Sequence, residues 1–395
     1  MVRRTRPSFA VTCLIIGVAI MFEGCGGGSS STGAPNGEGG NSSPSASTVS
    51  AGNYIWQSNG DTDLYVSSVA DNGALGAPVR AGGPARPSTG YRSLAVGPSR
   101  RYLYAFDTSF SLIRVLSLAG PGVQVSQELT CAPSAPDCPY YPVSNRGPLN
   151  SLSLDPTGKF LYIVESPATI EIFVTDDNGT GELRRGPAIT ENVPADLREG
   201  VITPSGKFLF VNDLTAGRMF GYSIGADGSL SAVPGSPFSV PLNGQPTHVI
   251  LDGSGLYLYA PLPAGGIAAF SINGSTGTLA NVPGSPFPTT ALPGGLAAAP
   301  GGFVYVTGQY GVLDAYKIGS NGALTPVPGS PFATADSSYS IAVDATGMFV
   351  YVGDYADSKV YGFAIDSPTG SLTPLPSSPF PSIPNPYMMA PFKVP

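Results

Sequence analysis

One stretch of this chain recurs several times, and the recurrence constrains the fold more than any other feature. It reads Leu-Asp-Pro-Thr-Gly-Lys-Phe-Leu-Tyr-Ile-Val at 154–164. Related stretches stand at 96–104, 201–211, 251–259, 299–306 and 343–352. Their spacing is about 45 to 49 residues, apart from one gap of about 58, and short-strand repeats of this period are typical of a β-propeller.

Each repeat reads as four short strands separated by turns. In Asp-Pro-Thr-Gly at 155–158, the Asp, Pro and Gly occupy positions of a type I turn that favour them. In the strand that follows, at 160–164, alternate residues share a face, and both faces are apolar. Because a propeller blade is covered by a neighbour on each side, this pattern favours a blade.

The repeats predict a ring that both ends of the chain close. Six blades are expected to open near residues 94, 152, 200, 249, 296 and 341. Residues 53–80 supply three more strands without an inner one, and 386–391 supply the missing inner strand. We therefore predict an all-β fold over 51–395, a seven-bladed β-propeller with four-stranded blades, closed by pairing the C-terminal strand with the N-terminal blade.

Proline marks the outer edge of several blades. The outer strands end in Val-Pro or Leu-Pro, and proline has no N–H to donate to a further strand. We expect the tags that follow, Gly-Ser-Pro-Phe or Ser-Ser-Pro-Phe, to be structural and to turn the chain inward, at 235–238, 284–287, 329–332 and 377–380.

The first 24 residues have the features of an export signal. Arginines precede a mostly apolar run at 9–22, which is shorter than the roughly 20 residues that a membrane span needs. The run ends in Phe-Glu-Gly-Cys at 22–25, which resembles a bacterial lipobox in its last two residues and departs from it in the first two. We expect a lipoprotein-type signal peptide over 1–24 and lipidation of Cys25, with plain secretion as the alternative.

A flexible tether is expected to follow the leader. Residues 25–50 are mostly Gly, Ser, Pro, Asn, Thr and Ala, which cannot bury enough apolar surface to order themselves. The formal net charge of −7 gives no basic footprint, so nucleic acid is not an expected partner. We expect an exported, membrane-anchored monomer at the cell envelope, with a small-molecule lactone, a glycan or a protein as its ligand.

The blade framework resembles a known group of proteins. Seven repeats with aromatic-Leu-Tyr-Val strands after an Asp-Pro-x-Gly-Lys turn are similar to the lactonase-like propellers. That group includes propeller-type 6-phosphogluconolactonases, muconate-lactonising propellers and YVTN-repeat surface proteins. The resemblance covers about residues 51 to 395, and the tags and leader look like secreted bacterial members. It implies the fold more strongly than an activity, because the matching residues belong to the framework.

Aligned repeats place a polar pair at the start of each inner strand, where the mouth of the central channel is expected. The pairs stand at 92–93, 150–151, 198–199, 247–248, 294–295, 339–340 and 386–387. The ionisable members are the candidate catalytic residues, namely Arg92, Arg198, Glu199 and His248. Candidate ligand-binding residues of the same rim are Asn150, Tyr339 and Tyr387.

These residue types fit hydrolysis of a lactone. His248 or Glu199 would act as general base on water. An arginine would hold an anionic substrate or stabilise the developing oxyanion, and the resemblance also implies His, Glu and Arg near the channel. The alternative is that the polar residues only solvate the rim, with His248 hydrogen-bonded to a neighbouring turn.

An insertion before the second complete repeat is the other distinctive feature. Cys131 and Cys138 are expected to form a disulfide outside the cytoplasm. The bridge would order a Pro-rich loop with Tyr140, Tyr141 and Arg146, which forms either a binding lip or only a rigid connection.

The remaining motifs exclude several chemistries. One histidine and so few cysteines leave no usual zinc set, and no phosphate loop, haem attachment or nucleophile elbow is present. We expect no metal and no cofactor. Two functions stay open: first a ligand- or protein-binding surface module, and as the alternative a lactone hydrolase with its site at the channel mouth.

Overall fold

The computed structural model describes residues 52–58, 64–80, 91–107, 112–118, 149–165, 168–186, 189–190, 195–386 and 388–394. All of them belong to one compact unit, residues 46–395. Within these ranges no helix has the length and hydropathy to cross a bilayer. The predicted leader, the tether with Cys25, and the loop with Cys131, Cys138, Tyr140, Tyr141 and Arg146 lie outside the described residues.

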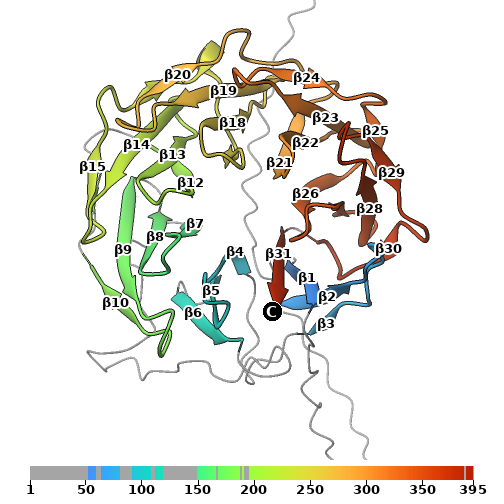
Figure 1. Ribbon diagram of the computed structural model, residues 1–395, viewed down its shortest axis with the longest axis horizontal. Coiled ribbons are helices and arrows are strands. Elements are labelled where there is room, and N and C mark those ends of the chain that lie inside the picture. The colour runs from blue at the N-terminus through green and yellow to red at the C-terminus, as the bar shows by residue number, and fades with distance from the viewer. Residues whose placement is uncertain are drawn as a thin grey trace, which may run out of the picture. The chain divides into compact units, whose positions relative to one another are not determined.

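Seven antiparallel sheets of the described residues form a ring, and in six of them the first strand in the chain is innermost (Figure 1). Blade 1 contains β4 (Tyr91–Val96), β5 (Tyr102–Asp107) and β6 (Leu112–Ser117). Blade 2 contains β7 (Leu149–Leu154), β8 (Phe160–Glu165), β9 (Thr169–Thr175), β10 (Leu183–Arg185) and the short β11 (Ile189–Thr190). Blade 3 contains β12 (Leu197–Ile202), β13 (Phe208–Asp213), β14 (Arg218–Ile224), β15 (Leu230–Ala232) and the short β16 (Phe238–Ser239).

The next three blades repeat this order. Blade 4 contains β17 (Ile250–Leu251), β18 (Tyr257–Pro261), β19 (Ile267–Ile272) and β20 (Leu279–Asn281), after the 3-10 helix η1 (Pro241–Asn243). Blade 5 contains β21 (Pro293–Ala299), β22 (Phe303–Gly308), β23 (Val312–Ile318), β24 (Leu324–Pro326) and the short β25 (Phe332–Ala333). Blade 6 contains β26 (Ser338–Val343), β27 (Phe349–Asp354), β28 (Lys359–Ile365), β29 (Leu372–Pro374) and the short β30 (Phe380–Pro381).

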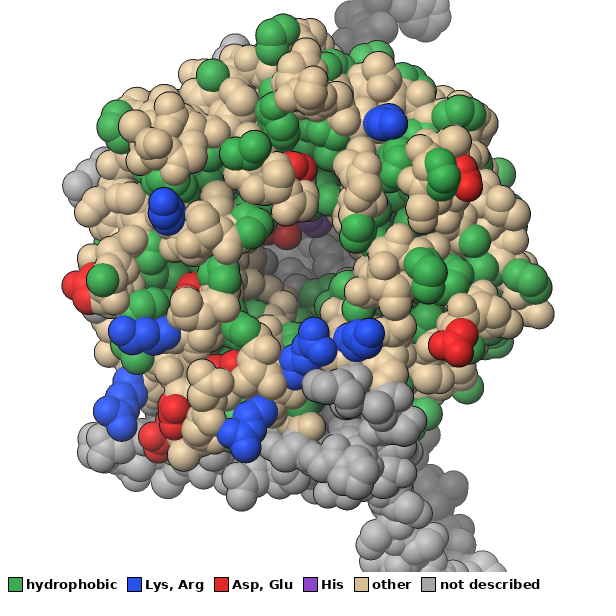
Figure 2. Space-filling view, in the orientation of Figure 1, with side chains coloured by type: hydrophobic (Ala, Val, Ile, Leu, Met, Phe, Trp, Pro, Cys, Tyr) green, Lys and Arg blue, Asp and Glu red, His purple; other side chains and the backbone are tan. Residues whose placement is uncertain are grey.

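Blade 7 is built from both ends of the chain, as the repeats predict. Its strands, from the inside outwards, are β31 (Met388–Val394), β1 (Gly52–Ser58), β2 (Tyr65–Val69) and β3 (Val79–Arg80). β31 pairs with β1 along its whole length, from Gly52 opposite Val394 to Ser58 opposite Met388. The predicted seven-bladed fold and its mode of closure are confirmed, and Figure 2 shows the ring hollowed at its centre.

The two faces of the ring carry different parts of every repeat. Because neighbouring strands are antiparallel, each inner strand begins opposite the end of the second strand, as Leu197 stands opposite Asp213. We call this side the rim face; it also carries the loops between the second and third strands. The opposite side, the turn face, carries the Asp-x-x-Gly turns, where Asp155 accepts hydrogen bonds from its own turn.

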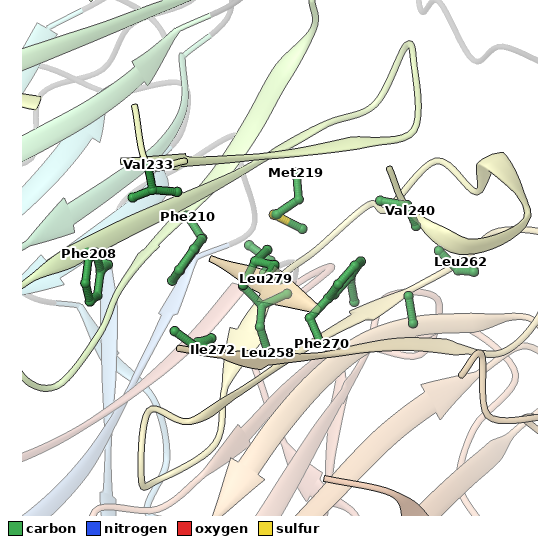
Figure 3. Packing of buried hydrophobic residues seen from close by; sticks show 13 residues of the cluster. Phe208, Phe210, Met219, Val233, Val240, Leu258, Leu262, Phe270, Ile272 and Leu279 are labelled. Carbon is green, nitrogen blue, oxygen red and sulfur yellow. The ribbon is translucent and has the colours of Figure 1, made fainter. Parts of the chain in front are cut away.

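Apolar side chains fill the spaces between blades on both sides of each second strand. Phe160, Tyr162 and Val164 pack against blade 3, whereas Leu161 and Ile163 pack against blade 1. The same arrangement joins blades 3 and 4, where Phe208 and Phe210 meet strands of the next blade (Figure 3). The described residues form seven such clusters, including those on both sides of blade 7. Both faces of the strand are apolar because both are buried.

Tyrosines of the second strands add directional links between blades. Several of these hydroxyls donate to a glycine carbonyl in a turn of the following blade, at 2.9 Å for Tyr162 to Gly228 and for Tyr305 to Gly370. Tyr351 of blade 6 donates to Gly73 of blade 7 at 2.7 Å, so the link also spans the point where the ring closes.

The Ser-Pro-Phe tags complete the outer edges of their own blades. A tag serine accepts a backbone N–H of the third strand with its Oγ at 2.9–3.0 Å; these serines are Ser236, Ser285, Ser330 and Ser378. The phenylalanine beyond it pairs with the same third strand, as β16 does with β14. The tags therefore pair with edge positions of the third strand that the short outer strands leave unpaired, a role that the sequence did not indicate.

Removing the closing hydroxyl tests the tyrosine links. Tyr351 is fully buried, so Tyr351→Phe leaves the Gly73 carbonyl without its donor and should cost about 1 to 3 kcal/mol of unfolding free energy in urea. Tyr257→Phe is the matched control, because its hydroxyl donates to Ser320 at an exposed position where water can replace it. Equal losses in the two variants would contradict the role given to the buried link.

Candidate functional site

The inner strands bulge at the positions where the sequence predicts a polar ring. The pairing register of β4, β7 and β26 shifts by one residue at Arg92, Asn150 and Tyr339. In β12 two residues, Arg198 and Glu199, stand opposite one residue of β13. A bulge takes a residue out of the ladder and re-aims its side chain, which explains why polar residues are tolerated here inside a packed ring.

Serines at this level of the inner strands tie neighbouring blades together. Ser93 accepts the backbone N–H of Leu152, and Ser151 accepts that of Gly200, both at 2.9 Å. Glu199 occupies the equivalent place in blade 3, where its Oε2 accepts the N–H of Val249 at 2.8 Å. A carboxylate thus makes a framework bond that a serine makes elsewhere.

Glu199 also pairs with the chain's one histidine. Oε2 of Glu199 lies 3.3 Å from Nδ1 of His248, and the two side chains are 35% and 49% exposed. In this arrangement Nδ1 faces the carboxylate, while Nε2 stands on the other side of the imidazole ring. The predicted catalytic residues Glu199 and His248 are therefore brought together across two blades, at the rim face.

The pairing changes the acidity of the imidazole. Burial by itself lowers the pKa of His248, but the hydrogen bond and the negative charge of Glu199 outweigh it. The net result is a pKa above the ordinary value of 6.5. The pair therefore favours the protonated imidazole more than an isolated histidine would.

A buried asparagine that the sequence analysis missed positions this pair. Asn212, on β13, is fully buried. Its Oδ1 accepts the N–H of Glu199, and its Nδ2 donates to the carbonyl of Pro246, both at 2.6 Å. The side chain joins the backbone of Glu199 to the segment that carries His248. Its signal was a polar residue directly before the last position of a second strand whose first four residues are apolar.

Arg198, the other predicted member of the bulge, has a carboxylate partner. Its Nη2 donates to Oδ2 of Asp196 at 2.6 Å, and the N–H of Asp196 donates to Oδ1 of the buried Asp213 at 2.9 Å. Oδ2 of Asp213 in turn accepts Nη2 of Arg218 at 2.7 Å. Arg198 therefore belongs to a network of charges that fixes the start of β12.

Of the other predicted site residues, some are described by their backbone alone and the rest lie outside the described residues. The side chains of Arg92, Asn150 and Tyr339 are outside the described set, although their strands are described. Tyr387, like Tyr140, Tyr141 and Arg146, is outside it altogether. In the described ranges no group of three or more His, Cys, Asp or Glu side chains is placed to hold a metal ion.

Comparison with known proteins shows which family part of the chain is similar to. Residues 199–379 match the family described as "Lactonase, 7-bladed beta-propeller". The chain has the fold of a seven-bladed β-propeller, and its residues 199–379 are similar to this family. The match begins at Glu199, so it includes the pair at the rim of this propeller.

The relatives of this propeller are distant. A 6-phosphogluconolactonase of Pectobacterium carotovorum is 25% identical over 205 residues, which is 49% of this chain and 56% of that protein's length. A putative 6-phosphogluconolactonase from Bacteroides fragilis superposes with a TM-score of 0.68 and 18% identity, over 88% of this chain and 99% of that one. The structure of Pseudomonas aeruginosa periplasmic gluconolactonase superposes with a TM-score of 0.64 and 18% identity, over 87% of this chain and 100% of that one. At these identities the structures support the fold alone.

Titration of His248 tests the pairing. We expect an NMR midpoint above 6.5 in the natural chain and a lower one in Glu199→Gln, which removes the charge and weakens the hydrogen bond. Because the folded pKa is raised, the pair's contribution to stability is present below the unfolded pKa and is lost as pH rises through the folded one. Identical midpoints in the two proteins would show that Glu199 does not act on the imidazole.

Proposed function

We propose that this propeller hydrolyses lactones at the rim face, with His248 as the general base and Glu199 as the group that orients it. The observation that carries the proposal is the Glu199–His248 contact at 3.3 Å, on bulged backbone beside the central hollow. The family match favours hydrolysis over a purely binding surface module, which the sequence alone had placed first.

The chemistry needs only water and the side chains of the rim. With its Nδ1–H directed to Glu199, neutral His248 would accept a proton from water at Nε2 while the water oxygen attacks the lactone carbonyl carbon. The ring C–O bond of the tetrahedral intermediate then breaks, and the imidazolium returns the proton to the departing alkoxide oxygen. One lactone and one water give one hydroxy acid.

Two further groups support this reaction. The bond from Val249 to Glu199 holds the carboxylate, and Asn212 holds the backbone on both sides of the pair, so the imidazole is positioned before substrate arrives. Arg198, next in the bulge, is paired with Asp196, so we assign it no step. We assign Arg92 no step.

Export belongs to the same proposal. The leader at 1–24 and the lipobox-like residues before Cys25 support a protein that leaves the cytoplasm and stays attached by a lipid. The Pseudomonas aeruginosa structural neighbour is described as periplasmic, which is consistent with this location. A Cys131–Cys138 disulfide would also fit there.

Hydrolysis by the purified full chain tests the function. In a pH-stat we expect turnover of neutral δ-lactones above the spontaneous rate, lowered about 100-fold or more by His248→Gln, because general-base catalysis is typically worth that much. The rate should rise with pH through the raised pKa of His248, since only the neutral imidazole accepts the proton. Lys207→Gln, an exposed change on the turn face, is the control.

Lactones also open spontaneously, so the rate with the protein must be compared with the rate in buffer alone, the buffer rate. Hydrolysis that never exceeds the buffer rate, in a chain whose fold is intact by circular dichroism, would refute the proposal. So would a His248→Gln protein as active as the Lys207→Gln control.

A further inference from the structure

Exposed apolar side chains gather on the rim face. Leu242, Leu292, Tyr310 and Tyr355 are all exposed, and all stand either in connections that enter inner strands or in loops between second and third strands. Leu242 and Tyr310 are the most exposed of them, at 78% and 79%. Both also have left-handed backbone, with φ of 60° and 63°, which bulky residues rarely adopt and which often marks functional sites.

These four residues, the apolar arc, stand on loops over blades 4, 5 and 6 that contact one another in turn. Gly244, two residues after Leu242, packs on Leu262 at the start of the next loop. A Cβ on Gly265, in that loop, would lie 4.0 Å from Cδ2 of Leu292. The carbonyl of Leu292 then accepts the N–H of Gln309 at 3.0 Å, which brings in Tyr310.

The contacts between loops continue from blade 5 to blade 6. The carbonyl of Gly311, beside Tyr310, accepts the N–H of Thr334 at 2.8 Å. Three residues further on, the carbonyl of Ser337 accepts the N–H of Tyr355 at 3.0 Å.

The apolar arc and the Glu199–His248 pair share a connection of the rim face. Leu242 and His248 belong to the same connection, which runs from the end of β16 to the start of β17. Asn212 fixes that connection through Pro246, and Thr247 donates its N–H to Pro261 at 3.4 Å. Exposed apolar surface therefore begins in the connection that carries His248 and extends over the loops of blades 5 and 6.

Among the side chains that the structure describes beside the pair and on blade 6, the charges are unfavourable for a phosphorylated molecule. Arg198 lies beside Asp196 at 2.6 Å and Arg218 beside Asp213 at 2.7 Å, so their positive charges are already balanced. Asp336 and Asp354, at the mouth side of blade 6, add negative charge. A phosphate dianion is usually held by several arginines or lysines, and these carboxylates would repel it.

We propose that the substrate is a neutral lactone with an apolar substituent, which lies on the apolar arc while the lactone ring lies at His248. This inference rests on the proposed function and names its substrate class. It separates this chain from the phosphorylated sugar lactone in the name of its Pectobacterium relative. Leu242 and Tyr310 are the residues that determine this specificity.

Binding of lactams tests the substrate class independently of turnover, because a ring N–H in place of the ring oxygen prevents hydrolysis. For the full chain, calorimetry should show 6-pentylpiperidin-2-one binding at least about tenfold more tightly than gluconolactam 6-phosphate. Leu242→Ser and Tyr310→Ala should each lower the affinity for the pentyl lactam by about five- to tenfold, since each substitution removes apolar contact. Leu256→Ser, at an exposed leucine of the turn face, should leave its affinity unchanged.

Each contrary result has a distinct meaning. Tighter binding of the phosphorylated lactam, equal effects of Leu242→Ser and Leu256→Ser, or no binding of the pentyl lactam would overturn the proposed substrate class. If the pentyl lactam binds as expected but no lactone is hydrolysed, the binding site stands and only the catalytic function fails.

Discussion

A sheet with two apolar faces is stable in water only between two other sheets, and this requirement shapes the whole ring. Each second strand sends alternate side chains to opposite neighbours, as Phe160 and Leu161 do, so every blade depends on the two beside it. An open array would leave two such faces exposed. Pairing β31 with β1 removes both, and Trp56, stacked on Phe392 at 5.1 Å, helps fill the last space.

The candidate site uses the framework that this closure provides. Inner strands must be tied to one another near the axis, and Ser93 and Ser151 do so with short side chains. In blade 3 the tie is Glu199, which keeps the framework bond to Val249 and adds a charge beside His248. A site of this kind requires few changes, because the bulge, the neighbouring backbone and the buried Asn212 already hold the side chains in place.

Repetition made the fold predictable, whereas the site depends on departures from repetition. The number of blades, the both-sided packing and the closing strand all follow from patterns that many positions share. The sequence also pointed to Glu199 and His248, because they are ionisable residues at one repeat position. It could not give the partner of Arg198 or the role of Asn212, since hydrogen bonds between blades depend on backbone distances that no spacing encodes. The apolar arc was missed for the same reason, because its members come from separate connections.

The most direct measurement is a crystal structure of the full chain with 6-pentylpiperidin-2-one bound. We predict that the lactam carbonyl carbon lies on the rim face within about 3.5 Å of a water held by Nε2 of His248. The pentyl group should lie along Leu242 and Tyr310. A lactam on the turn face, or on the rim face out of reach of His248, would contradict it.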